Sequence, residues 1–181
     1  MKIILPVKSI SAKKLTVWII ILLLSAALGA CDLTPGEIII GLSGACDADP
    51  LVVTKYEDTD DGICTEDDCS LREAVITANT CAGLQQIELP AGSYTLSIEG
   101  RGEDESRTGD LDITEKVDLI GRGGGASINA VSIDRVIHVI EGPDLEEPHI
   151  TLLKNLTLAG GAADDVGGGV YVQGANLVVN Q

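Results

Sequence analysis

The chain has 181 residues, a formal net charge of −16 and an aromatic content of only 2%, with no Phe. A surface this acidic repels nucleic-acid phosphates and anionic lipid head groups, so we expect no nucleic-acid partner. The scarcity of aromatic side chains predicts a narrow interior filled by aliphatic residues.

Residues 1–30 have the features of an export segment. Four lysines supply positive charge, an apolar run extends from Leu15 to Leu28, and Leu28-Gly29-Ala30-Cys31 closes the segment. This ending resembles a bacterial lipobox, in which the cysteine is acylated and becomes the new N-terminus after cleavage. We therefore expect a lipid anchor on Cys31 and a location at the cell envelope, on its extracellular face. The alternative is an uncleaved membrane anchor, although the stretch is shorter than the ~20 residues that a span prefers.

Residues 31–50 form a linker rich in Gly, Ala and Asp. Without residues 1–30, the chain keeps 12 − 4 = 8 basic and 28 acidic residues, a net charge of −20. Such a charge favours solubility outside the cell.

Four cysteines flank the next segment and are expected to be oxidised outside the cytoplasm. Three pairings are possible, and we favour Cys64–Cys69 together with Cys46–Cys81. The first would join an acidic turn to the start of a helix, and the second would join the linker to the end of that helix. A structural zinc site is the competing interpretation, but no histidine lies nearby and paired CxxC spacing is absent.

Residues 51–84 are predicted to form an N-terminal cap around a helix at 70–80. Ser70 and Glu73 have the spacing of a capping box, and an apolar stripe begins at Leu71 and continues through Ala74, Val75 and Ala78. We interpret Arg72 as a structural residue on the helix surface that anchors the acidic turn at 58–61.

Residues 85–181 contain short, aliphatic, β-branched segments separated by glycine-rich turns. Loosely periodic strands of this kind are typical of a parallel β-helix, in which glycines form corners and aliphatic side chains fill the interior. An antiparallel sandwich is the alternative, disfavoured because hairpin dipeptides such as Asn-Gly are missing. Strands are expected at 51–56, 87–90, 93–98, 111–113, 117–120, 136–140, 150–153, 155–158, 170–172 and 176–179.

Residues 58–64, 69–75 and 78–79 resemble the CSLREA domain, with Cys69-Ser70-Leu71-Arg72-Glu73-Ala74 as the most specific part. The resemblance continues through 87–96, 109–113 and 167–171. It implies a cap on a right-handed parallel β-helix in an exported bacterial or archaeal protein, without implying an activity. Members of the family are usually longer, so we expect 85–181 to be the first coils of an incomplete solenoid. Further coils or a partner are then expected beyond the strand at 176–179.

Acidic residues offer the main candidates for chemistry. Carboxylates on neighbouring coils could approach the spacing of a glycosidase pair, and the candidates are Asp110, Asp112, Asp118 and Asp134. A lyase would also need bound calcium and a base, for which Arg122 and Arg135 are the only plausible candidates. Because a chain with 28 acids produces such coincidences by chance, we assign no catalytic residue.

The segment Asp58, Asp60 and Asp61 before Gly62 weakly suggests a calcium loop, but the bidentate glutamate of an EF-hand is missing. We therefore expect no cofactor, with calcium as a minor alternative. His138 is interpreted as a strand residue and not as a ligand, and His149 has no visible partner.

These observations predict an exported, lipid-anchored scaffold or adhesin that contacts glycans or cell-surface matrix. The alternative is a carbohydrate-active enzyme, a polysaccharide lyase or glycoside hydrolase, whose groove lies largely outside this chain.

Overall fold

The computed structural model describes residues 46–62, 64–142, 149–164 and 166–181. The predicted export segment at 1–30, the predicted lipidation site Cys31 and most of the predicted linker at 31–50 lie outside these ranges. Everything described belongs to one compact unit, which extends from Ile40 to Gln181. Among the described residues, no helix has the length and hydrophobicity that a membrane crossing requires.

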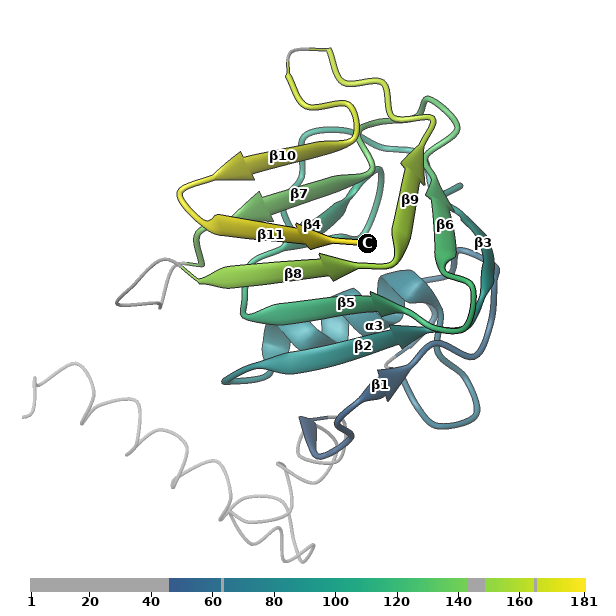
Figure 1. Cartoon of the computed structure of the whole chain (residues 1–181). Coiled ribbons are helices and arrows are strands. Elements are labelled where there is room, and N and C mark those ends of the chain that lie inside the picture. The colour runs from purple at the N-terminus through teal and green to yellow at the C-terminus, as the bar shows by residue number, and fades with distance from the viewer. Residues whose placement is uncertain (1–45, 63, 143–148, 165) are drawn as a thin grey trace, which may run out of the picture. The chain divides into compact units, whose positions relative to one another are not determined.

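The described residues form one helix and eleven short strands (Figure 1). The helix is α3 (Leu71–Thr80), and β1 (Leu51–Val52) precedes it. The strands that follow the helix are β2 (Gln85–Leu89), β3 (Gly92–Thr95), β4 (Leu111–Ile113), β5 (Val117–Gly121), β6 (Ala126–Asn129), β7 (Ile137–Ile140), β8 (Ile150–Lys154), β9 (Leu156–Ala159), β10 (Val170–Gln173) and β11 (Asn176–Asn180).

The strands form three parallel sheets that surround a common interior (Figure 1). Sheet A has the order β1-β2-β5-β8-β11, sheet B has β3-β6-β9, and sheet C has β10-β7-β4. The chain therefore visits sheets A, B and C in turn before it begins the next coil. This arrangement confirms the parallel β-helix, and the antiparallel sandwich is wrong because every pair of neighbouring strands is parallel.

Aliphatic side chains stack in columns through the interior. In sheet A, Leu51 pairs with Ile87, Ile87 with Leu119, and Leu119 with Leu153, and all four side chains are buried. Fully burying one such side chain is worth ~1.5–3 kcal/mol, so these columns are the main source of cohesion between coils. In the last described coil, the aliphatic side chains of β9 and β10 and Leu177 of β11 are only partly buried, and Val179, which pairs with Leu153, is exposed.

Gly121 marks the corner between sheets A and B. A Cβ at this position would collide with the carbonyl oxygen of Asn155 in the next coil. Asn155 itself has a left-handed backbone with φ of 53°. The close approach of the two coils therefore requires a residue without a side chain at position 121.

The cap lies against the first coil, where α3 contacts β2 and β4. Ser70 is the N-cap of the helix, and its side chain accepts a hydrogen bond from the backbone N–H of Glu73 while the Glu73 carboxylate accepts one from the N–H of Ser70. The predicted capping box is thus confirmed. Disulfides join Cys46 to Cys81 and Cys64 to Cys69, the pairing favoured from the sequence.

Two predicted strands are clearly shorter in the structure, and one strand was not predicted. The strand expected at 93–98 ends at Thr95. The strand expected at 51–56 is only β1 (Leu51–Val52), because the backbone N–H groups of Thr54 and Lys55 turn toward the carbonyl of Cys69. Strand β6 was not predicted, because Ala-Ser-Ile-Asn lacks an aliphatic run and is held in place by pairing with β3 and β9.

Candidate functional site

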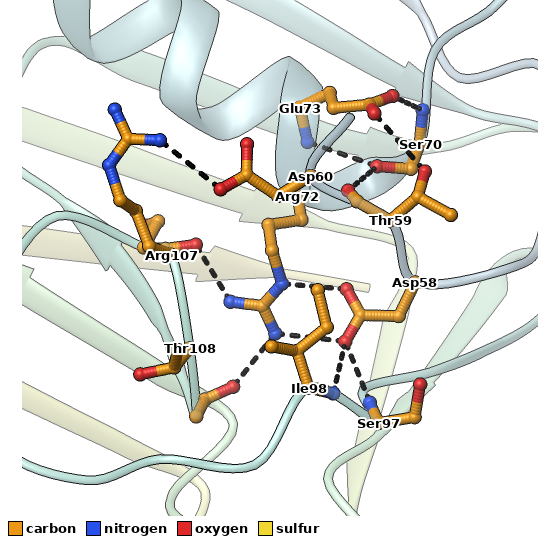
Figure 2. Close-up of polar contacts among 12 residues, drawn as sticks. Asp58, Thr59, Asp60, Ser70, Arg72, Glu73, Ser97, Ile98, Arg107 and Thr108 are labelled. Carbon is orange, nitrogen blue, oxygen red and sulfur yellow. Dashed lines mark hydrogen bonds and ion pairs between the residues drawn. The ribbon is translucent and has the colours of Figure 1, made fainter. Parts of the chain in front are cut away.

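The centre of the cap is an ion pair between Arg72 and Asp58 (Figure 2). The guanidinium Nε donates to Asp58 Oδ1 at 2.7 Å, and Nη2 donates to Oδ2 at 3.0 Å. Asp58 Oδ2 also accepts from the backbone N–H groups of Ser97 and Ile98, at 2.7 and 3.0 Å. One carboxylate therefore connects the cap to the segment that follows β3.

The remaining donors of Arg72 reach the loop before β4. Nη1 donates to the carbonyl oxygens of Ser106 at 2.7 Å and Asp110 at 3.3 Å, and Nη2 donates to that of Gly109 at 2.9 Å. All five N–H groups of the guanidinium are satisfied. Because the Arg72 side chain has no exposed surface, the prediction that it lies on the helix surface is wrong. Arg72 is a buried residue that joins the cap to the first coil.

Glu73 is the second anchor of the cap. Its carboxylate accepts from the N–H of Ser70 at 2.7 Å, from the Thr59 hydroxyl at 3.1 Å and from the N–H of Asp61 at 3.1 Å. Burial alone would raise the pKa of Glu73, but these hydrogen bonds and Lys55 more than offset it, so the pKa is lowered. The carboxylate therefore stays ionised and holds the acidic turn against the helix.

The acidic residues proposed for calcium are each held by a different cation. Asp58 pairs with Arg72, Asp60 with Arg107 at 3.2 Å, and Asp61 with Lys55 at 3.6 Å. Their carboxylates are not among the described groups whose ligand atoms converge well enough to hold a metal ion. Calcium binding at this turn stays a prediction.

A second polar group lies on the outer face of sheet C. Asp112, His138 and Tyr171 are aligned on β4, β7 and β10, and each lies between two aliphatic residues that face the interior. The rings of His138 and Tyr171 stack with centroids 4.9 Å apart. Alternation along each strand places this row on the side away from the core. The loop that carries Ser106 lies beside the row, because its hydroxyl and backbone bond directly to Asp112.

The Asp112 carboxylate is fully buried and only half satisfied. Oδ2 accepts from the N–H of Ser106 at 3.0 Å. The Ser106 hydroxyl donates to the carbonyl oxygen of Asp112 and accepts from the N–H of Asp112. Oδ1 has no hydrogen-bond partner among the described residues, although it lies 3.3 Å from His138 Nδ1. The Asp104 carboxylate of the same loop lies 3.7 Å from that nitrogen. We call Asp104, Asp112 and His138 the sheet C cluster.

Proton affinities in this region are strongly perturbed. Burial and the charge of Asp110 raise the pKa of Asp112 to about 8, and burial and the charge of Asp134 raise the pKa of Asp110 to about 6. Burial and the nearby Arg135 lower the pKa of His138. Such shifts are frequent at functional sites, although buried structural networks also produce them.

The catalytic candidates are only partly brought together. Asp110 and Asp134 lie near the sheet C cluster, and Asp110 pairs with Arg135 at 3.5 Å. Asp118 lies on sheet A, and Arg122 pairs with Glu88 there. The three carboxylates near sheet C are buried, so a polysaccharide could not reach them in this conformation.

His149 precedes β8 and is buried, with neither ring nitrogen hydrogen-bonded among the described residues. Burial lowers its pKa. No acidic, cysteine or histidine side chain in the described ranges groups with it as a ligand set.

A depression of about 510 Å³ lies over sheet B. Its lining is small and polar, with no aromatic side chain among the described residues that form it: Gly92, Gly123, Gly124, Gly125, Ala126, Ser127, Asn155, Leu156, Thr157 and Gln181. Sugar rings commonly bind against aromatic faces, so this surface offers hydrogen bonds but no stacking platform.

Fold and cap together define the class of protein as a parallel β-helix whose first coil is covered by a disulfide-linked helix. Comparisons with family models, curated proteins and solved structures find no match. The sheet C cluster was not predicted as a unit from the sequence, although Leu-Asp-Ile and Ile-His-Val each show a polar residue between two aliphatic ones.

Proposed function

We propose that this protein is an exported, lipid-anchored scaffold that presents the loops of a β-helix to glycans or matrix at the cell surface. The observation that carries the proposal is the construction of the cap. Two disulfides brace the cap internally. The buried pair of Arg72 and Asp58 holds the cap to the first coil through hydrogen bonds to the backbone at 97–98 and 106–110. Disulfides form and persist in the oxidising environments outside the cytoplasm.

The resemblance to CSLREA proteins supports the same proposal through the cap residues Ser70, Arg72 and Glu73. In the structure these residues make contacts that join the helix to the acidic turn and the coil. A cap of this kind needs no substrate to explain its buried polar groups. The partly buried aliphatic residues of β9, β10 and β11 further support an additional coil or a partner against that end.

Localisation is tested by expressing the full chain in a bacterium with labelled palmitate. The wild-type chain should be labelled and should be cleaved by protease added to intact cells, and Cys31→Ala should lose the label. Thiol alkylation without reductant should modify none of the four cap cysteines. An unlabelled chain with reduced cysteines, protected inside the cell, would sink the proposal.

Binding is tested by applying the purified full chain in detergent to a glycan array and to extracellular matrix proteins. A reproducible subset of ligands, bound without any turnover, is the expected result.

One observation favours a carbohydrate-active enzyme as second candidate: Asp134 lies close enough to Asp110, and Asp110 close enough to Asp112, for each charge to raise the pKa of its neighbour. Release of unsaturated or reducing sugars from polyuronates by the purified chain, abolished by Asp110→Asn, would favour the enzyme. Their burial favours the scaffold.

A further inference from the structure

We propose that the sheet C cluster, Asp104, Asp112 and His138, binds a first-row divalent transition metal ion such as Zn²⁺. One ligand atom from each side chain lies within 4.8 Å of the others. The three residues come from two neighbouring strands and from the loop before β4, so one ion would join three separate segments. This site is distinct from the acidic turn at 58–61.

Distances within the sheet C cluster match the edges of a coordination shell. His138 Nδ1 lies 3.3 Å from Asp112 Oδ1 and 3.7 Å from Asp104 Oδ1. Two ligands that each lie about 2.1 Å from a tetrahedral Zn²⁺ are about 3.4 Å apart. Asp104, the third ligand, is 71% exposed, so its side chain has room to move toward the ion.

An independent observation points to a ligand at this place. Asp112 is 0% exposed, yet its Oδ1 has no hydrogen-bond partner among the described residues. A buried carboxylate oxygen without a partner is costly, and a bound cation removes that cost. Oδ1 is also the oxygen that faces His138 Nδ1, so the unsatisfied atom points into the cluster.

The surroundings hold Asp112 in the orientation that coordination needs. Ser106 fixes Oδ2 through its backbone N–H, and the carbonyl of Ser106 is in turn held by Arg72. Second-shell hydrogen bonds of this kind orient ligating carboxylates in metal sites. The cap therefore positions the loop and the carboxylate before any ion binds.

The mixed donor set selects the class of metal. Ca²⁺ and Mg²⁺ prefer shells made of oxygen, whereas imidazole nitrogen with carboxylate oxygens suits Zn²⁺ and its neighbours in the first row. Three protein ligands leave a fourth position for water or an external ligand. An ion here would tie the loop that carries Asp104 to the outer face of sheet C.

The test uses the full chain in detergent, purified without a histidine tag and stripped of metal with a chelator. The chain is titrated with Zn²⁺ by calorimetry at ~0.15 M salt, because salt screens diffuse binding to the acidic surface. One saturable site per chain is expected. Asp104→Asn should weaken binding at least tenfold, whereas Glu105→Gln, an equal loss of charge at an exposed neighbour, should leave it unchanged. Equal binding by both variants, or no saturable binding, would overturn the proposal.

A second measurement identifies the imidazole nitrogen that binds the metal ion. The chain has two histidines, so long-range ¹H–¹⁵N spectra resolve both imidazoles. Zn²⁺ should shift Nδ1 of His138 and leave His149 unchanged, and a hundredfold excess of Ca²⁺ should not reverse the shift. A response at His149 instead, or displacement by Ca²⁺, would refute the site or its metal class. His138→Gln should abolish the Zn²⁺ response, while His149→Gln should keep it.

Discussion

Replacing Arg72 by methionine should destabilise the whole unit and not only the cap. Methionine keeps much of the length of the side chain but removes all five donors. Asp58 would then be left as a buried carboxylate, with a side chain only 2% exposed and no cation. The carbonyl oxygens of Ser106, Gly109 and Asp110 would lose the donors that now hold them.

The magnitude follows from these losses. Breaking a buried ion pair by removing one partner costs ~3–5 kcal/mol. Unsatisfied buried carbonyls cost ~1–3 kcal/mol each, but water entering the loop would recover part of this. We therefore expect a loss of at least ~4 kcal/mol, a large share of the ~5–15 kcal/mol that stabilises a typical domain.

Urea unfolding followed by circular dichroism, with the disulfides intact, measures the change. Arg107→Met is the matched control, because this arginine pairs with Asp60 while 56% exposed. A surface pair of this kind contributes little to stability, because solvent screens it. If Arg72→Met lowered the free energy of unfolding by less than ~1 kcal/mol, and by no more than the control, the interpretation of Arg72 as the buried link between cap and first coil would be refuted. In the double variant with Asp58→Asn, the loss should be clearly smaller than the sum of the two single losses.

Three further outcomes are expected. A disulfide that closes a longer loop restricts the unfolded chain more and so stabilises the fold more. Removing Cys46–Cys81, with a separation of 35 residues, should lower the free energy of unfolding in urea by ~4 kcal/mol, and removing Cys64–Cys69, with a separation of 5, by ~2 kcal/mol. A larger loss for Cys64–Cys69 would contradict this reasoning. Gly121→Ala should cost ~1–3 kcal/mol through collision with Asn155, whereas Gly124→Ala, whose Cβ meets nothing within 4 Å, should be nearly neutral by the same assay. The pKa of Asp112 is raised to about 8, so the metal-free folded chain binds the Asp112 proton more tightly than the unfolded chain does. Protonation of Asp112 therefore stabilises the fold fully below about pH 4, and this contribution is lost as the pH rises through 8. Asp112→Asn should flatten the fall in melting temperature between about pH 5 and 8, and an unchanged slope would assign it to other groups.

The helix and its start were predictable because their signals are local. Ser70 and Glu73 are three residues apart, and both halves of the capping box act within that distance. The aliphatic strands of the interior were predictable for a similar reason, since their composition reports burial directly. Strand β6 was not, because its small and polar residues become a strand only through partners on two other coils.

The role of Arg72 and the sheet C cluster depended on long-range register. The carbonyl partners of Arg72 lie 34 to 38 residues further along the chain, and nothing near the helix identifies them. Asp112 and His138 become neighbours only once the register of β4 and β7 is known. Because the loops between coils vary in length, sequence periodicity could not fix that register.

The contacts of Arg72 have a consequence for modularity. Arg72, in the first turn of the helix, donates hydrogen bonds to the backbone at 106–110, and the Asp58 carboxylate accepts hydrogen bonds from the backbone at 97–98. A graft of residues 46–84 onto a foreign solenoid would therefore carry a guanidinium without its acceptors. The smallest transferable piece therefore extends through β4. During synthesis, the cap cannot complete its contacts with the first coil until that strand has been made.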